Sequence, residues 1–227
     1  SIINEASNCF SITGNNIIFN LAGYTIDGVG ATPTAVAIAV TSNGVTIMNG
    51  TVKEYAVGII YSLASNGTVT NMTLTNNSQA MILEGTGSHG NSKIVSNIIE
   101  NNTLDVSQGI GLIFYHNSSI ISNIIKNNRI GIGTNNADFS NFSFNNITAT
   151  YGISLAEVDN SYIAFNNVSG TTRAISVGGT TNPPDVSSNN TISDNTISSS
   201  GIELTDKSSN NTGNNNCGGI IIDNGVN

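Results

Sequence analysis

The sequence predicts an all-β protein, a parallel β-solenoid of about eight to nine coils. Three observations lead to this fold class. A short apolar pattern repeats about every 24 residues along the chain. The apolar positions in each unit alternate over two to five residues, without the 3.6-residue period of a helix. Asparagine, which accounts for 38 of the 227 residues, recurs between the apolar segments, where turns are expected.

The repeat is built on pairs of apolar residues five positions apart. The second members of successive pairs are 21 to 29 residues apart. A unit of this length can bury its apolar side chains only by stacking on its neighbours, so each unit is expected to form one coil. The pairs are Leu21/Ile26, Ile47/Val52, Val69/Leu74, Ile94/Ile99, Ile120/Ile125, Phe142/Ile147, Ile163/Val168 and Ile192/Ile197.

A second short apolar strand lies ahead of each later pair and often opens with Gly or Ala. Asn, Gly and Thr fill the positions between the strands, where a helix would carry Ala, Leu, Glu and Lys. We therefore expect short strands joined by tight turns. These second strands are predicted at residues 36–38, 58–60, 80–83, 109–112, 131–132, 152–155, 174–177, 201–204 and 219–222.

Asparagine occupies one turn position in five successive units, two residues before the second apolar residue of the pair. Asn tolerates the left-handed backbone region and forms local hydrogen bonds, which suits the corner of a solenoid. Stacked copies about 4.8 Å apart can bond side chain to side chain. The sequence therefore predicts an asparagine ladder; the alternative is that each Asn fills its own turn individually. The predicted ladder is Asn97, Asn123, Asn145, Asn166 and Asn195.

The segment Ile12–Phe19 leading to Gly23–Gly28 resembles the right-handed parallel β-helix repeats of the pectate-lyase-like superfamily, close to repeat-rich surface proteins of archaea. The resemblance covers nearly the whole chain and implies a single β-solenoid domain over residues 1–227. It is specific for the fold and weak for function, because lyases, hydrolases, copper-maturation proteins, adhesins and structural proteins share this repeat.

The composition and net charge limit the classes of partner that the protein is expected to bind. The net charge is −8, and the six basic residues form no stripe that could neutralise a phosphate backbone, so we expect no nucleic-acid partner. No apolar run approaches the roughly 18 residues of a membrane span. Ser1 at the start suggests processing and export, to the cell envelope or cell surface. In an exported chain, sequons on exposed turns are potential glycan acceptors. The sites favoured for glycosylation are Asn66, Asn76, Asn117, Asn141, Asn189 and Asn210.

The acidic residues are scattered along the sequence. Glycosidic chemistry needs two positioned carboxyls, or calcium with a strong base. Glu157 and Asp159 are two residues apart and would share a face of a strand, which makes them the best available carboxylate pair. Solvated strand and turn positions explain these acids better, and we expect a protein that is not an enzyme.

A metal site is not expected. His89 and His116 lie about one coil apart, but two His and three Met residues are too few potential ligands to predict a copper site. No cofactor is expected. The aromatic residues between positions 139 and 165 are expected to be stacked core and surface side chains and not a sugar-binding platform.

The two cysteines, Cys9 and Cys217, lie near opposite ends of the chain. About eight coils of about 4.8 Å would separate them, whereas a disulfide needs Cα atoms within about 7 Å. An intermolecular head-to-tail disulfide is the favoured interpretation, and two free thiols are the alternative.

Three segments break the period of the repeat, residues 29–35, 84–92 and 178–188. They are expected to be inserted loops that make lateral contacts between stacks; the alternative is that they are exposed loops of variable sequence.

No amphipathic helix precedes Cys9 or follows Cys217, so end caps are not evident and the ends are expected to pair with further copies of the chain. Together with the Asn-rich repeat and the cysteines, this resembles the amyloid-like sheath proteins of methanogenic archaea. The resemblance implies a structural cell-surface protein that self-assembles head-to-tail into a sheath, hoop or layer. The alternatives are an extracellular carbohydrate-binding or polysaccharide-processing β-helix, with Glu157 and Asp159 as site residues, and a periplasmic copper-handling solenoid.

Overall fold

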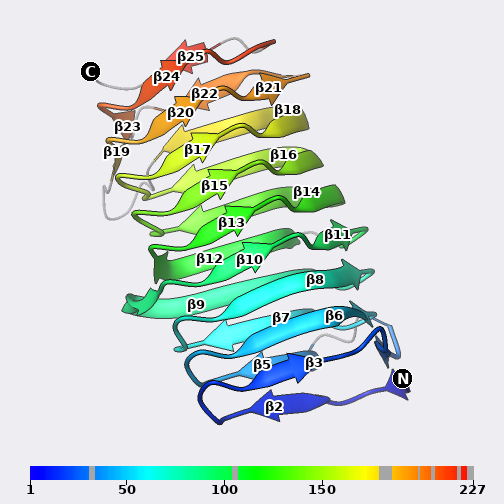
Figure 1. Ribbon diagram of the computed structural model, residues 1–227. Helices are drawn as coiled ribbons and strands as arrows, with labels where there is room; N and C mark the ends of the chain where they lie inside the picture. The colour runs from blue at the N-terminus through cyan, green and yellow to red at the C-terminus, as the bar shows by residue number, and fades with distance from the viewer. Residues whose placement is uncertain are drawn as a thin grey trace.

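The chain winds into a right-handed parallel β-helix of about nine coils (Figure 1). A computed structural model describes residues 1–30, 34–103, 107–178, 186–198, 200–205, 208–218 and 221–223. Every strand pairing within these ranges is parallel, and each strand pairs with strands about one repeat away in sequence. The coils are stacked like steps, with the N-terminal end at the bottom and the C-terminal end at the top of Figure 1. Predicted fold class and observed fold class agree.

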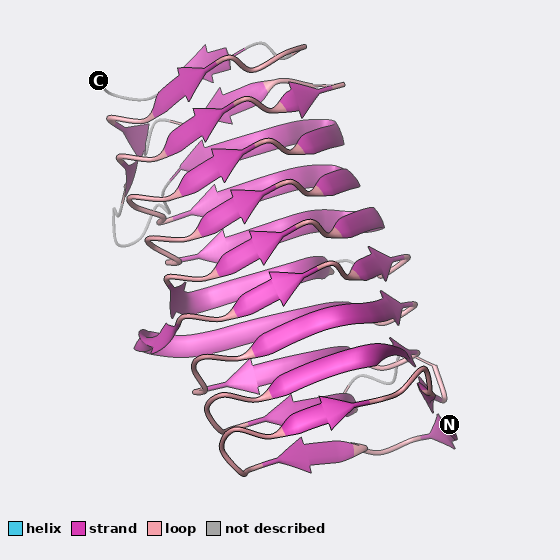
Figure 2. Cartoon of the chain, in the orientation of Figure 1, coloured by secondary structure: helices cyan, strands magenta, loops and turns pink. Residues whose placement is uncertain are grey.

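Each coil presents three faces, and the strands stack on equivalent strands of adjacent coils (Figure 2). The first face is built from short strands, because its apolar residue is flanked by only one residue on each side. Its separate strands are β3 (Ile18–Asn20), β10 (Lys93–Val95), β13 (Ser119–Ile121), β15 (Asn141–Ser143), β17 (Tyr162–Ala164), β20 (Thr191–Ser193) and β24 (Thr212–Asn214).

The second face continues from the first after a sharp corner. Its separate strands are β1 (Ile2–Glu5), β4 (Thr25–Gly28), β11 (Ile98–Glu100) and β21 (Thr196–Ile197). Two strands run from the first face into the second, β6 (Thr46–Lys53) and β8 (Thr68–Thr75).

The third face returns the chain to the start of the next coil. Its separate strands are β2 (Phe10–Ile12), β5 (Val36–Val40), β7 (Val57–Ser62), β9 (Gln79–Gly90), β12 (Gln108–His116), β22 (Ile202–Leu204) and β25 (Ile221–Asp223). Three strands bend from the second face into the third, β14 (Ile124–Asn135), β16 (Asn146–Ala156) and β18 (Asn167–Gly178). A small two-stranded sheet, β19 (Ser187–Ser188) with β23 (Ser208–Ser209), lies beside the end of the third face.

The apolar pairs of the repeat point into the core. In the middle coils, the first members lie in register across the first face, as in Ile94, Ile120 and Phe142, and the second members do so across the second face, as in Ile99 and Ile125. All five are at most 1% exposed. Burial of these side chains in every coil is the main stabilising contribution of the repeat.

The first coil departs from the expected register. The sequence pairs Leu21 with Ile26, but the residue stacked on Ile47 is Phe19, and only Ile26 keeps its expected place, against Val52. Leu21 instead lies at the corner after β3, where its N–H donates to the Met48 carbonyl oxygen at 2.9 Å. Leu21 is still buried, so a buried apolar residue alone does not identify the register.

The asparagines at residues 97, 123, 145, 166 and 195 form one continuous column at the first corner. In each step the Nδ2 group donates to the Oδ1 atom of the next Asn at 3.0 Å, and Asn216 extends the column by one more step. The same Oδ1 atoms accept the backbone N–H of the preceding Asn. Each buried amide is thereby satisfied, as buried polar groups must be.

The period-breaking segments take different structures. Residues 84–90 were expected in an inserted loop but belong to β9, which reaches Gly90. The register against β12 shifts between Ile113 and Tyr115, so the additional residues of β9 bulge outward while pairing resumes at His89. Gly87 and Gly90 provide the positive φ angles that this bulge needs. Residues 31–33 and 179–185 of the other two predicted loops, and residues 219–220 of the last predicted strand, lie outside the described residues.

Candidate functional site

The strongest departure from the repeat lies at the third corner, where the third face turns into the first face of the next coil. We define the third-corner column by one backbone position, whose carbonyl oxygen accepts an N–H from the preceding coil. Most coils carry Asn, Ser or Gly there, and three consecutive coils carry titratable side chains instead. The column runs through Asn43, Ser65, Gly90, His116, Asp138, Asp159, Ser188 and Ser209. Asn15 has the equivalent position in the first coil, because its Oδ1 atom accepts the N–H of Asn43.

Backbone N–H groups hold the acidic side chains of this column in place. Asp138 Oδ1 accepts the N–H of Asp159 at 2.8 Å. Asp159 Oδ1 accepts both the N–H of Ser188, at 2.6 Å, and its hydroxyl, at 2.7 Å. The two carboxyl groups therefore project from adjacent coils, which are about 4.8 Å apart.

His116 completes the row on the other side of Asp138. Its Nδ1 atom accepts the N–H of Asp138 at 3.0 Å and lies 3.4 Å from Asp138 Oδ2. In the neutral imidazole the proton is then on Nε2, because Nδ1 acts as an acceptor. The side chains of His116 and Asp138 are 19% and 26% exposed, so both groups are within reach of a ligand in solvent.

The surroundings of Asp138 shift the pKa of its carboxyl group upward. Burial raises the pKa of the Asp138 carboxyl above its ordinary value, and the negative charge of Asp159 acts in the same direction. The hydrogen bond from Asp159 and the proximity of His116 oppose the increase without cancelling it. A carboxyl group with a raised pKa beside a second carboxyl is the arrangement used for general acid catalysis.

An exposed aromatic ring borders this row. The position after the third-corner column is Asn or Gly in the other described coils, as at Asn117 and Asn160, but it is Phe139 in the coil of Asp138. Phe139 has a φ of 55° and is 62% exposed. We refer to His116, Asp138, Asp159 and Phe139 as the third-corner site.

The predicted carboxylate pair, Glu157 with Asp159, is not the pair that the structure brings together. Glu157 follows the end of β16 at a bend with a φ of 53°, so the two residues do not alternate along one strand as expected. Asp159 lies instead against Asp138 of the preceding coil. The sequence signal that could have revealed this site is the spacing. His116 and Asp138 are 22 residues apart, and Asp138 and Asp159 are 21 residues apart, which in both cases is one repeat.

The residues considered for copper do not form a suitable donor set. Among the described residues, no group of three or more His, Cys, Asp or Glu side chains could hold a metal ion. His116 uses Nδ1 for the N–H of Asp138, and His89 uses Nδ1 for the N–H of Thr86. Met72 and Met81 are fully buried in the core. These side chains therefore do not fit a copper site.

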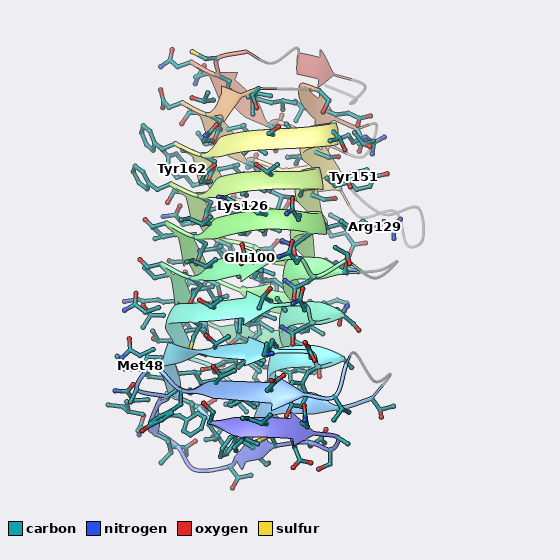
Figure 3. All side chains as sticks on the ribbon, turned by 90° about the vertical axis from the view of Figure 1, so that its right-hand side faces the viewer. Met48, Glu100, Lys126, Arg129, Tyr151 and Tyr162 are labelled. Atoms are coloured by element: carbon teal, nitrogen blue, oxygen red, sulfur yellow. The ribbon has the colours of Figure 1, made fainter. Side chains whose placement is uncertain are left out.

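A separate hollow of about 520 Å³ lies at the second corner, between the second and third faces. Figure 3 shows this side of the molecule, with Arg129 and Tyr151 toward one edge and the in-register Glu100 and Lys126 near the centre. The lining contains no carboxylate, so it lacks the acid–base pair of the third corner. The hollow is lined by Thr103, Asn127, Asn128, Arg129, Thr148, Ala149, Thr150 and Thr171.

The predicted glycosylation and disulfide residues are distributed over the whole solenoid. Cys9 is half-buried and Cys217 is exposed, and both are free thiols. Five of the six favoured sequon asparagines are exposed, whereas Asn141 is half-buried. No helix in the described part of the chain has the length and apolar character that crossing a membrane requires.

Solved structures similar to this chain share its fold at low sequence identity. DFA-IIIase from Arthrobacter chlorophenolicus A6 without its lid has a TM-score of 0.71 and 14% identity, over 91% of this chain and 58% of the enzyme chain. The same enzyme in complex with DFA-III has a TM-score of 0.68 and 15% identity, over 97% and 56% of the two chains. The Dettilon tailspike protein has a TM-score of 0.57 and 14% identity, over 97% and 61%. The chain thus spans somewhat more than half the length of these proteins.

These neighbours change two expectations. The expectation that the protein is not an enzyme was wrong as an inference from the fold and the scattered acids, because structures similar over nearly the whole chain belong to an enzyme. The resemblance to archaeal sheath proteins is not supported by these similarities. The resemblance to pectate-lyase-like β-helices is confirmed.

Among curated proteins, no significant match to the chain was found. A family match covers residues 1–182, about four fifths of the chain, and includes all of the third-corner site. The family is described as periplasmic copper-binding protein (NosD). Because the match extends over most of the coils, the chain belongs to the NosD family.

Proposed function

We propose that the protein is a carbohydrate-processing β-helix protein that acts outside the cytoplasm, with acid–base chemistry at the third-corner site. The observation that carries the proposal is the replacement of Asn, Ser and Gly by His116, Asp138 and Asp159 in three consecutive coils. The neighbours support the substrate class, since DFA-IIIase is a carbohydrate-processing enzyme. A location outside the cytoplasm is supported by the periplasmic family and by the tailspike neighbour.

The geometry supports different roles for the two carboxyl groups. Asp138, whose pKa is raised by burial, is the general acid that protonates the leaving-group oxygen. Asp159, on the next coil, is the carboxylate nucleophile that bonds to the glycosyl group as the leaving group departs, and water then hydrolyses that bond. The coil spacing of about 4.8 Å is close to the separation of about 5–5.5 Å between the carboxyls of retaining glycosidases. His116 holds Asp138 through the backbone hydrogen bond, and Phe139 provides an apolar surface beside the reacting bond.

The test is turnover of oligosaccharides. The purified chain is incubated with a panel that contains DFA-III, inulin oligosaccharides and oligogalacturonates, and products are separated by anion-exchange chromatography. We expect cleavage that falls at least about 100-fold in Asp138→Asn and Asp159→Asn, because loss of a general acid or second carboxyl typically has an effect of this size. Asp194→Asn, the same chemical change at the first corner, is the matched control and should retain activity. Equal activity in all three variants, or no turnover by the parent chain, would contradict the proposal.

A second proposal concerns association between copies of the chain, with lateral contacts through residues 29–35, 84–92 and 178–188. The supporting observation is that Cys9 and Cys217 are free and lie in coils near opposite ends of the solenoid. A head-to-tail Cys9–Cys217 disulfide between copies is compatible with this placement. Burial raises the pKa of the Cys9 thiol, so its reactive thiolate is scarce at neutral pH and the bond would form slowly. Non-reducing electrophoresis with mapping of linked peptides tests it, and a monomer with both thiols free would refute it.

A further inference from the structure

A second departure from the repeat lies at the first corner, between the first and second faces. One position of this corner has a positive φ in eight successive coils, so it requires the left-handed backbone conformation. Asn, Ser and Asp fill it in six coils, as expected for residues that tolerate this conformation. Two adjacent coils carry phenylalanine instead. The residues are Asn49, Asn71, Ser96, Ser122, Phe144, Phe165, Asp194 and Asn215.

Neither phenylalanine is favoured by its backbone conformation or by burial in the core. Phe144 and Phe165 have φ angles of 57° and 55°, which are unfavourable for a bulky side chain. Their side chains are 57% and 46% exposed, so they contribute little to the core. The rings stack on each other, with centroids 5.0 Å apart and planes 8° apart. Together they form an exposed aromatic strip that extends from one coil to the next along the solenoid axis.

Polar groups border this strip on both sides. On the first face, Tyr162 is 37% exposed, and its hydroxyl lies 3.4 Å from the Ser193 hydroxyl; Figure 3 shows Tyr162 at the edge of the molecule. On the second face, the exposed Asn146 and Asn167 form an amide row, with Nδ2 of Asn167 donating to Oδ1 of Asn146 at 3.4 Å. The strip therefore combines an apolar centre with hydroxyl and amide edges.

We propose that Phe144, Phe165 and Tyr162 form a stacking platform for a neutral saccharide chain that runs along the solenoid axis. A sugar ring offers an apolar face of C–H bonds and an edge of hydroxyl groups, which matches the aromatic strip and its polar borders. A protein partner, including a second copy of this chain, is disfavoured by size, because a stable interface involves about 20–30 residues a side. The platform has only three aromatic side chains, so it is much smaller than such an interface.

The platform lies on the same two coils as the carboxyl groups of the third-corner site. Phe144 is six residues after Asp138, and Phe165 is six residues after Asp159, across strands β15 and β17 of the first face. The platform shares its ligand class with the proposed function, but binding there needs no acid–base chemistry. Binding and turnover can therefore be separated by mutation.

Binding is tested by affinity electrophoresis and isothermal titration calorimetry with three probes: laminarin and inulin as neutral polysaccharides, and polygalacturonate as an acidic one. Binding of a neutral probe is expected, with at least about tenfold weaker binding in the double variant Phe144→Asn/Phe165→Asn. Asn is the residue of equivalent positions, so the melting temperature should be unchanged or higher. Leu63→Asn, at another exposed left-handed position, is the matched control and should bind like the parent chain.

Three outcomes would overturn the platform: no binding of a neutral probe by the parent chain, unchanged binding in the double variant, or a change in oligomeric state in that variant on sedimentation analysis. If the double variant loses thermal stability, the variant Tyr162→Ala is tested instead. Weaker binding of the neutral probe by this variant supports the platform, and unchanged binding contradicts it. Asp138→Asn/Asp159→Asn should bind the neutral probe normally without turnover. Absence of turnover in the parent chain would thus refute the proposed activity and leave the binding result intact.

Discussion

The Oδ1 atom of Asp138 accepts the backbone N–H of Asp159 at 2.8 Å, and this one contact joins two coils and orients two carboxyl groups. The amide oxygens of Asn15 and Asn43 accept the equivalent N–H groups nearer the N-terminus. An amide is therefore sufficient for the structural contact, and the negative charge at Asp138 is not needed for folding. A charge that folding does not need is best explained by function.

Replacement of Asp138 by Asn should separate stability from activity. We expect Asp138→Asn to keep the hydrogen bond from Asp159 and to gain about 1 kcal/mol of stability at neutral pH, or roughly 2–4 °C in Tm. Carbohydrate turnover should be lost in the same variant. Thermal unfolding and the chromatographic assay measure the two effects. A variant that is less stable than the parent chain would show that the carboxylate itself supports the fold.

The raised pKa of Asp138 predicts the sign of a pH dependence. Because the folded state holds the proton more tightly than the unfolded state, the favourable contribution of protonated Asp138 is fully present below the unfolded pKa of about 4. It is lost as the pH rises through the higher folded pKa. The unfolding free energy of Asp138→Asn should therefore exceed that of the parent chain by an amount that grows as the pH rises through this window. A difference that is independent of pH would contradict the assignment.

The asparagine column predicts a large cost for a single substitution at its centre. Asn145 Oδ1 accepts the N–H and Nδ2 groups of Asn123, and its own Nδ2 donates to Asn166 and to the Ile120 carbonyl oxygen. Asn145→Ala leaves these buried partners unsatisfied and should destabilise the protein by about 3–5 kcal/mol. Chemical denaturation measures the change.

The neighbouring exposed residue provides the control for this prediction. Asn146 is solvent-exposed, and Asn146→Ala should change the unfolding free energy by less than about 0.5 kcal/mol. Similar effects of the two substitutions would show that the column does not stabilise the solenoid.

The space around Gly152 on the third face is too small for a larger side chain. A Cβ atom at this position would overlap the carbonyl oxygen of Ala174 and the side chain of Val168. Gly152→Ala should therefore cost about 1–3 kcal/mol through local displacement of the coil. Ser154→Ala, two residues along the same strand and half-buried, should be close to neutral in the same denaturation experiment.

The donor set predicts the result of a copper titration. Because the described residues form no cluster of three titratable ligands, the chain should retain no stoichiometric copper after dialysis, as measured by elemental analysis. His116→Ala and His89→Ala should leave the copper content unchanged. One retained copper per chain that is lost in either variant would place a copper site at these histidines.

The predictions from the sequence agree with the structure for the features that recur in every repeat. Pairs such as Ile120 with Ile125 revealed the coil length, because a 24-residue unit with alternating apolar residues can be buried only by stacking. The Asn at residues 97, 123 and 145 marked a corner for the same reason. In the first coil the pattern was misleading, since both Phe19 and Leu21 are apolar and only pairing with Ile47 selects between them.

The amino-acid sequence alone thus determined the all-β class, the coil repeat, the core positions and the asparagine corner, because each depends on a local pattern that recurs. The third-corner site and the aromatic strip were decided by tertiary structure. Asp138 and Asp159 are 21 residues apart, as are Phe144 and Phe165, and they become neighbours only when coils stack in register. Sequence proximity favoured Glu157 with Asp159, but in a solenoid the nearest neighbour of a side chain is one repeat away, along the axis.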